Sequence, residues 1–361
     1  MQRLRALTQR QSESGPRQTT WENLPFEFKV MVKDHLDVNS RNALRCCSKS
    51  DRDVVDSGPH TLVKLEIQSE LKQFLKHTQF SCGTTKKRVT VARRYATSTS
   101  WVKMGTDDAV DKIMRAFKNR HSVVDQIVLN SERKYLKGIE KLMTKLMRAI
   151  EIRRALHYTY LWKVKQLKWI GPLQCPLFFQ FLGQLDPQYL HTLYIIGDIS
   201  VDREVFEAMK NTVQWKALKE CRITSPLELH LDTFHHFAKM EIQVPKLEVH
   251  MFLEFIQKFM DKTLLTLSYF MIGSFTPMAF EWRLPILQHF FRNAFIELKG
   301  EVHHITQRPI HRFQLPRDPE KVLVVNFTEN SIIGMVAGKN SVTDAFIIFL
   351  MRMNTRFTWM Q

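Results

Sequence analysis

Three histidines that lie close together in the sequence are of a type that could bind a metal. His230, His235 and His236 lie within seven residues of one predicted helix, and zinc takes imidazole nitrogen as a ligand, usually in a set of four. We find no complete tetrahedral set around them. Partly exposed histidines beside the core residues Phe234 and Phe237 are the simpler interpretation. It also applies to His303, His304 and His311, and we expect no cofactor.

Motifs with a known catalytic mechanism are missing from the sequence. It contains no G-x-S-x-G, no G-x-x-x-x-G-K and no G-x-G-x-x-G. The five cysteines, which form no C-x-x-C pair, are Cys46, Cys47, Cys82, Cys175 and Cys221. Free thiols are typical of a reducing compartment, so we expect a cytoplasmic or nuclear protein. Cys46 and Cys47 are expected to be buried in a helix and inert. We therefore expect that the protein is not an enzyme.

The formal net charge of +17 leaves three interpretations open. The charge can belong to a solvated surface, to a surface that binds nucleic acid or an anionic membrane, or to one that attracts an acidic protein. The run KKRVTVARR at 86–94 could contact phosphates or direct nuclear import, but a strand with a basic solvent face is simpler. We expect the positive charge to concentrate on one face of residues 86–170.

The first residues, 1–18, are polar and rich in arginine, without the apolar segment of a signal peptide, so we expect a disordered basic tail. No apolar run approaches the roughly 20 residues of a membrane helix, so no membrane partner is expected.

Residues 21–57 have the pattern of short helices. Pro25 suits a first helical turn, and Phe28, Val32 and Leu36 recur at four-residue spacing on one face. Asn39 or Ser40 can cap a second helix, whose apolar positions are Leu44, Cys47, Val54 and Val55. About forty residues rarely fold alone, so part of this apolar surface should pack on the next domain and part on a partner.

From residue 61 onward, strand patterns appear and then alternate with helices. Leu62–Ile67 and Val89–Val91 predict an antiparallel meander across 61–95. Further strands are predicted at 123–129, 167–170, 193–196, 221–223, 240–244 and 264–272. The predicted helices cover 111–119, 133–156, 177–185, 202–210 with Asp202 as N-cap, 229–237 and 247–260. A hairpin is expected from 322–327 and 332–336, followed by a capping box at Ser341–Asp344 and a helix over 345–353.

The strands recur with a period in the twenties. Leu167, Leu193 and Cys221 are separated by 26 and 28 residues, and steps of 19 and 27 follow to Met240 and Leu267. One strand and one helix per period are typical of an open α/β solenoid such as a leucine-rich repeat, although the LxxLxLxxN signature is missing. The sequence therefore predicts an α/β fold, a small N-terminal helical domain followed by an irregular leucine-rich-repeat-like solenoid.

Two sets of residues resemble known families. The F-box pattern is resembled by Leu24-Pro25-x-Glu27 together with Val32, Leu36, Leu44 and Cys47-Ser48. The residues Trp21 and Arg41 at their positions are similar to those of the large nematode F-box family. Members of that family carry a C-terminal FTH-type domain. Gln214-Trp215-Lys216, Phe234–Phe237 and Met240–Ile242 are similar to elements of that domain.

The resemblance implies that the chain consists of domains with different functions. Residues 19–60 would be the F-box, 61–105 a β-rich connection, and 106–361 the FTH-type domain that captures a target protein. An F-box docks on the Skp-type adaptor of a cullin-based ubiquitin ligase and performs no chemistry. The docking residues would be Leu24, Pro25, Glu27, Val32, Leu36, Leu44 and Cys47. The alternative is a basic nucleic-acid-binding protein or a general scaffold, in which residues 21–57 only cap the solenoid.

Overall fold

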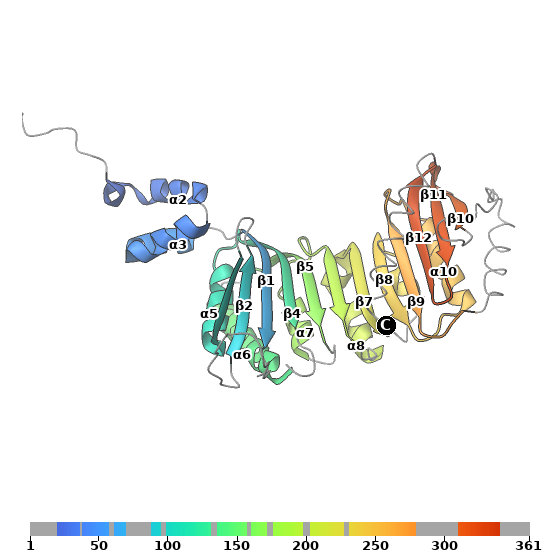
Figure 1. The fold of residues 1–361 in the computed structure, drawn as a ribbon, viewed down its shortest axis with the longest axis horizontal. Coiled ribbons are helices and arrows are strands. Elements are labelled where there is room, and N and C mark those ends of the chain that lie inside the picture. Colours follow the sequence, from blue (N-terminus) through green and yellow to red (C-terminus); the bar gives the residue numbers. More distant parts are fainter. Residues whose placement is uncertain are drawn as a thin grey trace, which may run out of the picture.

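The computed structural model describes residues 20–36, 38–57, 61–69, 88–94, 99–130, 136–156, 160–171, 176–197, 203–226, 231–278 and 310–339. These residues form a mixed α/β fold with one large sheet and helices, and a group of short helices precedes it (Figure 1). Several predicted features lie outside the described residues: the tail 1–18, Lys86, Lys87, Cys82, Cys175, Asp202, His230, His303, His304, Ser341–Asp344 and the helix 345–353.

Twelve strands make up the sheet. They are β1 (Thr61–Ser69), β2 (Arg88–Arg94), β3 (Thr99–Gly105), β4 (Val123–Asn130), β5 (Lys163–Ile170), β6 (Thr192–Ile196), β7 (Glu220–Pro226), β8 (Lys239–Val244), β9 (Tyr269–Ser274), β10 (Ile310–Leu315), β11 (Asp318–Phe327) and β12 (Ser331–Gly338). Their order is β10-β11-β12-β9-β8-β7-β6-β5-β4-β1-β2-β3. The seven central strands run parallel, and antiparallel strands extend the sheet at both ends.

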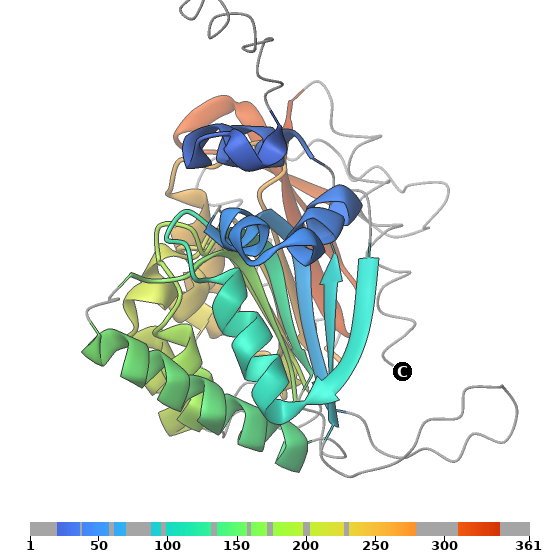
Figure 2. The ribbon, with the colours of Figure 1, turned by 90° about the vertical axis from the view of Figure 1, so that its left-hand side faces the viewer.

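Helices connect most of these strands. The 3-10 helices are η1 (Trp21–Asn23) and η3 (Leu231–Phe234). The α-helices are α2 (Phe26–His35), α3 (Val38–Cys47), α4 (Lys49–Ser57), α5 (Thr106–Ala116), α6 (Leu136–Ala155), α7 (Pro176–Leu182), α8 (Arg203–Lys210), α9 (Val213–Ala217) and α10 (Val249–Met260). Helices α5 to α8 lie on one side of the sheet (Figure 2). None of the described helices combines the length and the apolar character of a membrane span.

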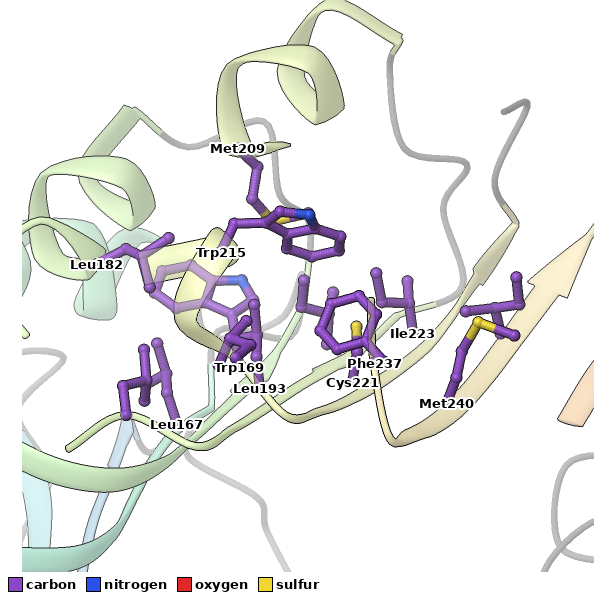
Figure 3. Packing of buried hydrophobic residues seen from close by; sticks show 14 of the residues in the cluster. Leu167, Trp169, Leu182, Leu193, Met209, Trp215, Cys221, Ile223, Phe237 and Met240 are labelled. Carbon is purple, nitrogen blue, oxygen red and sulfur yellow. The ribbon is translucent and has the colours of Figure 1, made fainter. Parts of the chain in front are cut away.

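The register of the parallel strands places the predicted repeat positions side by side. Leu167 pairs with Leu193, Leu193 with Cys221, and Cys221 with Met240. The side chains of this row point toward the helical layer, where Trp215 and Met209 lie over them (Figure 3). A second buried row follows two residues later, because side chains alternate along a strand. It consists of Ile67, Leu129, Trp169, Ile195, Ile223, Ile242 and Ile272.

A third buried residue lies three positions before six members of the first row, either within the strand or just ahead of it. These residues are Leu62, Val124, Val164, Leu190, Leu218 and Phe237. The resulting spacing is the LxxLxL half of the leucine-rich-repeat signature, with isoleucine, valine, methionine, cysteine, phenylalanine or tryptophan in place of some leucines. The full signature is missing, but this half was present in the sequence and could have aligned the strands more accurately.

The structure corrects several predicted boundaries. The last parallel strand begins at Tyr269, so Phe270 and not Leu267 continues the first row. Leu267 lies in the preceding turn with a φ of 69°, and its N–H donates to the carbonyl of Val336. The helix predicted over 229–237 is only the four-residue η3. Strands β3 and β10 and helix α9 were not predicted.

The two ends of the sheet agree better with the sequence prediction. β1 and β2 form the predicted antiparallel pair. The predicted hairpin is β11 and β12, in which Phe327 pairs with Ile332 across Glu329 and Asn330. Strand β12 then pairs with β9 and covers an edge that the parallel strands would otherwise expose.

Candidate functional site

Helix α2 presents apolar side chains to solvent. Phe28, Met31 and Val32 are 57%, 60% and 41% exposed. On an adjacent side of the helix, Lys29 and Lys33 are 7% and 1% exposed. A contiguous apolar surface rimmed by polar residues commonly marks an interaction site. The apolar stripe is therefore the leading candidate for a docking surface on the described chain.

The buried lysines of α2 have local partners. The Lys29 Nζ lies 5.6 Å from the ring centroid of Trp21 and donates to the carbonyl of Glu22 at 3.3 Å. The Lys33 Nζ lies 3.0 Å from the Oδ1 of Asp34. These contacts compensate in part for removing the ammonium groups from water, a removal that is costly without a partner. Only the Lys29 contacts reach another element, η1, and so hold the lysine side of α2 inward, because the Lys33–Asp34 pair lies within α2 itself.

Asp51 ties the start of the helical group to its last helix. The Trp21 Nε1 donates to one oxygen of the carboxylate at 2.6 Å, and the Ser48 Oγ donates to the other at 2.8 Å. Both hydrogen bonds, the one from Trp21 first, lower the pKa of Asp51 below its ordinary value. The Asp51 N–H donates back to Ser48 at 3.0 Å, as in a capping box that opens α4.

Two arginines fasten the remaining helix ends. Arg45 donates to both oxygens of Asp56 at 2.9 and 3.2 Å, and joins α3 to α4. Arg41 donates to the carbonyls of Leu36 and Asp34, both at 2.9 Å, where α2 ends. The predicted second helix is thus two helices divided at Ser48. Asn39 and Ser40 lie inside α3 and do not precede it, so they are not its N-cap.

None of the seven residues predicted to dock an adaptor is buried. Leu24, Leu36 and Leu44 are half-buried, and the exposed ones are Pro25, Glu27, Val32 and Cys47. Pro25 is the N-cap of α2 and not a first-turn residue. Glu27, in the first turn, suits the positive end of the helix dipole. The four-residue spacing in the sequence predicted Phe28 on this face but not Met31, which is 60% exposed. Phe26 is also 47% exposed, but it is two residues from Phe28 and so lies on another side of the helix.

The two neighbouring cysteines contradict one expectation. Cys46 and Cys47 are both exposed, and the Cys47 thiol donates to the carbonyl of Ala43 at 3.3 Å. The prediction that these two thiols are buried is therefore wrong.

One described hydrogen bond connects the helical group to the sheet region. The Asn119 side chain, after α5, donates to the carbonyl of Ser57 at 2.7 Å. Helices α2 and α3 lie beyond the amino-terminal end of β1, away from the helical layer (Figures 1 and 2). The apolar stripe of α2 is thus separate from the core of the sheet.

The face of the sheet opposite the helices carries paired polar side chains. The Tyr194 hydroxyl donates to Glu220 at 2.6 Å, and the Tyr269 hydroxyl donates to Glu241 at 2.9 Å. Arg222 lies 2.9 Å from the same Glu241 carboxylate. Burial, reinforced by these carboxylates, raises the tyrosine pKa values. Such a network can hold side chains in fixed positions for a ligand, but it has no arrangement of nucleophile and base.

The Gln214-Trp215-Lys216 element combines structural and exposed positions. The Gln214 amide donates to the carbonyl of Leu185 at 3.0 Å and so joins two successive units. The Trp215 ring packs edge-on against Phe237, with centroids 5.0 Å apart. Lys216 is exposed. Two of the three residues therefore serve the fold, and the third faces solvent.

Of the two described histidines beside Phe237, His236 takes part in the packing of the fold. The ring centroids of His236 and Phe237 are 3.9 Å apart, and the His236 Nε2 lies 3.2 Å from the carbonyl oxygen of Trp215. Burial lowers the pKa of His236. His235 is exposed, whereas Phe234 and Phe237 are buried. The prediction of partial exposure is wrong for His311, which is buried and only 8% exposed. Over the ranges that the structure describes, no three His, Cys, Asp or Glu side chains are grouped as a metal site would require.

The fold defines a class, a mixed α/β protein with one large sheet. The sequence model of the FTH domain family matches residues 149–280, which include β5 to β9, so the chain contains an FTH domain over somewhat more than a third of its length. No curated protein matches the chain, and no solved structure does so.

Proposed function

We propose that this protein is the substrate-recognition subunit of an SCF (Skp–cullin–F-box) ubiquitin ligase and performs no catalysis itself. Its helical group would dock the Skp-type adaptor, and through it a cullin. Its FTH domain would bind a target protein. We also propose that β4 to β9 and their helices form an irregular, leucine-rich-repeat-like solenoid. The sequential strand order and the recurring buried rows support this part of the proposal.

The outward apolar stripe of α2 is the observation that carries the proposal. Phe28, Met31 and Val32 would each transfer aliphatic or aromatic surface from water into a partner groove. Full burial of such a side chain contributes about 1.5–3 kcal/mol. FTH domains are generally associated with F-box-type proteins, which independently favours an adaptor as the partner of this helix.

The test uses two matched double variants of the full-length chain. Phe28→Asp/Val32→Asp places charges on the α2 stripe. Phe275→Asp/Val213→Asp makes the same substitutions at side chains that are both 62% exposed elsewhere. We expect the α2 variant to lose co-purification with a Skp-type adaptor, because each carboxylate would have to be desolvated in the groove. The matched control should retain the adaptor as the wild type does.

Two results would end the proposal. One is a wild-type chain that does not bind a Skp-type adaptor. The other is equal recovery of the adaptor by the wild type and the α2 variant. A weaker substitution, Leu24→Ala/Pro25→Ala, tests the predicted motif itself without adding charge, and its unfolding midpoint shows whether the helical group is intact.

A further inference from the structure

The helical layer is thinnest in the unit between β7 and β8. Cys221 and Met240 are 19 residues apart, whereas the neighbouring steps of the same row are 28 and 30 residues. This unit contains the four-residue η3 where its neighbours contain α8 and α10. A short unit cannot fill the same space beside full helices. A cleft of about 1130 Å³ lies there, bordered by α8, α9, η3 and the start of α10.

The cleft carries an excess of positive charge. Four of its lining residues are cationic, namely Arg203, Lys210, Lys216 and Lys246. Its two acids already have basic partners: Glu207 lies 2.7 Å from Lys210, and Asp232 lies 3.3 Å from Lys258. Among the described residues, neither Arg203 nor Lys216 forms an ion pair, and both are exposed. They can therefore bind an anion without first breaking an internal contact.

The described lining of the cleft exposes almost no large aromatic surface. Trp215 lines it but is only 1% exposed, because Phe206, Phe234 and Phe237 pack around its ring. Single-stranded nucleic acids are usually held by bases stacked on exposed aromatic rings. Carboxylates need only exposed cations, and the volume of the cleft accommodates several side chains.

We propose that this cleft binds an acidic segment of a protein, through aspartate or glutamate carboxylates that contact Arg203 and Lys216 and compete with Glu248 for Lys246, whose Nζ lies 3.9 Å from the Glu248 carboxylate. The inference rests on the proposed function only in identifying that protein as the ligase target. It gives the FTH domain a binding surface on the helical side, in the gap left by its shortest unit. The positive charge of the whole chain would attract such a segment from a distance.

The experiment uses the full-length protein without adaptor and a fluorescent oligoglutamate peptide, with oligoglutamine of equal length as reference. We expect fluorescence anisotropy to show preferential binding of oligoglutamate. Arg203→Gln/Lys216→Gln should weaken it roughly three- to tenfold, as expected from removing two surface charge contacts. Lys141→Gln/Arg148→Gln, an equal change of charge at exposed positions of α6, should leave the affinity unchanged.

Three outcomes would overturn the proposal. They are equal binding of the two peptides, an equal loss of affinity in the α6 control, and tighter binding of a single-stranded oligonucleotide that the Arg203→Gln/Lys216→Gln variant also loses. Lysine acetylation of the wild-type chain, mapped by mass spectrometry, adds a test that needs no variant. Oligoglutamate should protect Lys216 and Lys246 and leave Lys141 reactive. Loss of adaptor binding in the α2 variants would not alter these results.

Discussion

At the scale of single residues, Lys262 joins the end of α10 to the unit that contains η3. Its Nζ donates to the carbonyl of Phe237 at 2.5 Å and to that of His235, and lies 4.4 Å from the ring centroid of Phe259. Burial lowers the pKa of Lys262 to about 8. The structure thus holds an ammonium group where water is largely excluded, a position that disfavours its charged form.

The lowered pKa of Lys262 should make the free energy of unfolding depend on pH. Its folded pKa of about 8 lies below the ordinary 10.5, so the unfolded state binds more protons between these values and the free energy of unfolding rises with pH. Lys262→Met lacks this rise. From pH 8 to about 9.5, the free energy of unfolding of the wild type should rise relative to that of Lys262→Met by on the order of 1 kcal/mol. One pKa unit corresponds to about 1.4 kcal/mol.

Urea denaturation at a series of pH values measures this difference. The series should stop below pH 10, because the raised pKa values of Tyr194 and Tyr269 make stability fall once tyrosines ionise in the unfolded chain. Parallel stability profiles for wild type and Lys262→Met would contradict the assignment.

At the scale of elements, β12 and β9 fit together because one residue lacks a side chain. Gly334 pairs with Phe270, and a Cβ at Gly334 would lie 2.2 Å from the Cζ of that ring. Phe270 is fully buried and packs edge-on against Phe255 and Phe259 of α10, so the ring cannot easily move aside. The C-terminal hairpin can therefore pair with the parallel strands only if this position remains small.

We expect Gly334→Ala to destabilise the protein by about 1–3 kcal/mol, the usual cost of overpacking. Thermal or urea denaturation measures the change. Gly183→Ala is the matched control, because its Cβ would lie at an ordinary distance of 3.4 Å from the carbonyl oxygen of Phe179. Combining Gly334→Ala with Phe270→Leu should cost less than the sum of the single changes, since the smaller side chain relieves the overlap. An unchanged stability in Gly334→Ala would disprove the close approach.

At the scale of the whole molecule, the parallel strands need protection at both ends. Strands β2 and β3 extend the sheet beyond β1, and β12, β11 and β10 extend it beyond β9. An exposed strand edge presents unpaired N–H and C=O groups that pair readily with another chain. The antiparallel strands therefore keep the row of parallel strands from pairing with other copies at these two positions.

Removing one of these ends should make the chain self-associate. A chain of residues 1–278 ends after β9 and lacks β10 to β12, whereas a chain of residues 1–339 retains them. We expect the shorter chain to form concentration-dependent oligomers or aggregates, because its β9 edge is free, and the longer one to behave like the full chain. Light scattering coupled to size exclusion measures the mass of each. A monomeric shorter chain would show that β9 needs no cover.

The sequence alone determined which positions of the repeat are equivalent. Strand alternation and a period in the twenties identified Leu167, Leu193, Cys221 and Met240, which are register partners in the sheet. The pattern failed at Leu267, because an apolar residue in a turn looks like one in a strand until its backbone conformation is known. It also missed α4, although Ser48 and Asp51 have the spacing of a capping box.

Only the tertiary structure decided which sides of these elements face water. Helical spacing places Phe28 and Val32 on one face, but the direction of that face depends on Trp21 and Asp51, which hold the lysine side inward from other elements. Likewise, the 19-residue spacing between Cys221 and Met240 does not reveal whether the neighbouring units close over the short unit or leave a cleft beside it. The helix and strand patterns are set by residues that are neighbours along the chain. Exposure is set by contacts with elements that are distant in the sequence, and the residues of a local pattern do not specify those contacts.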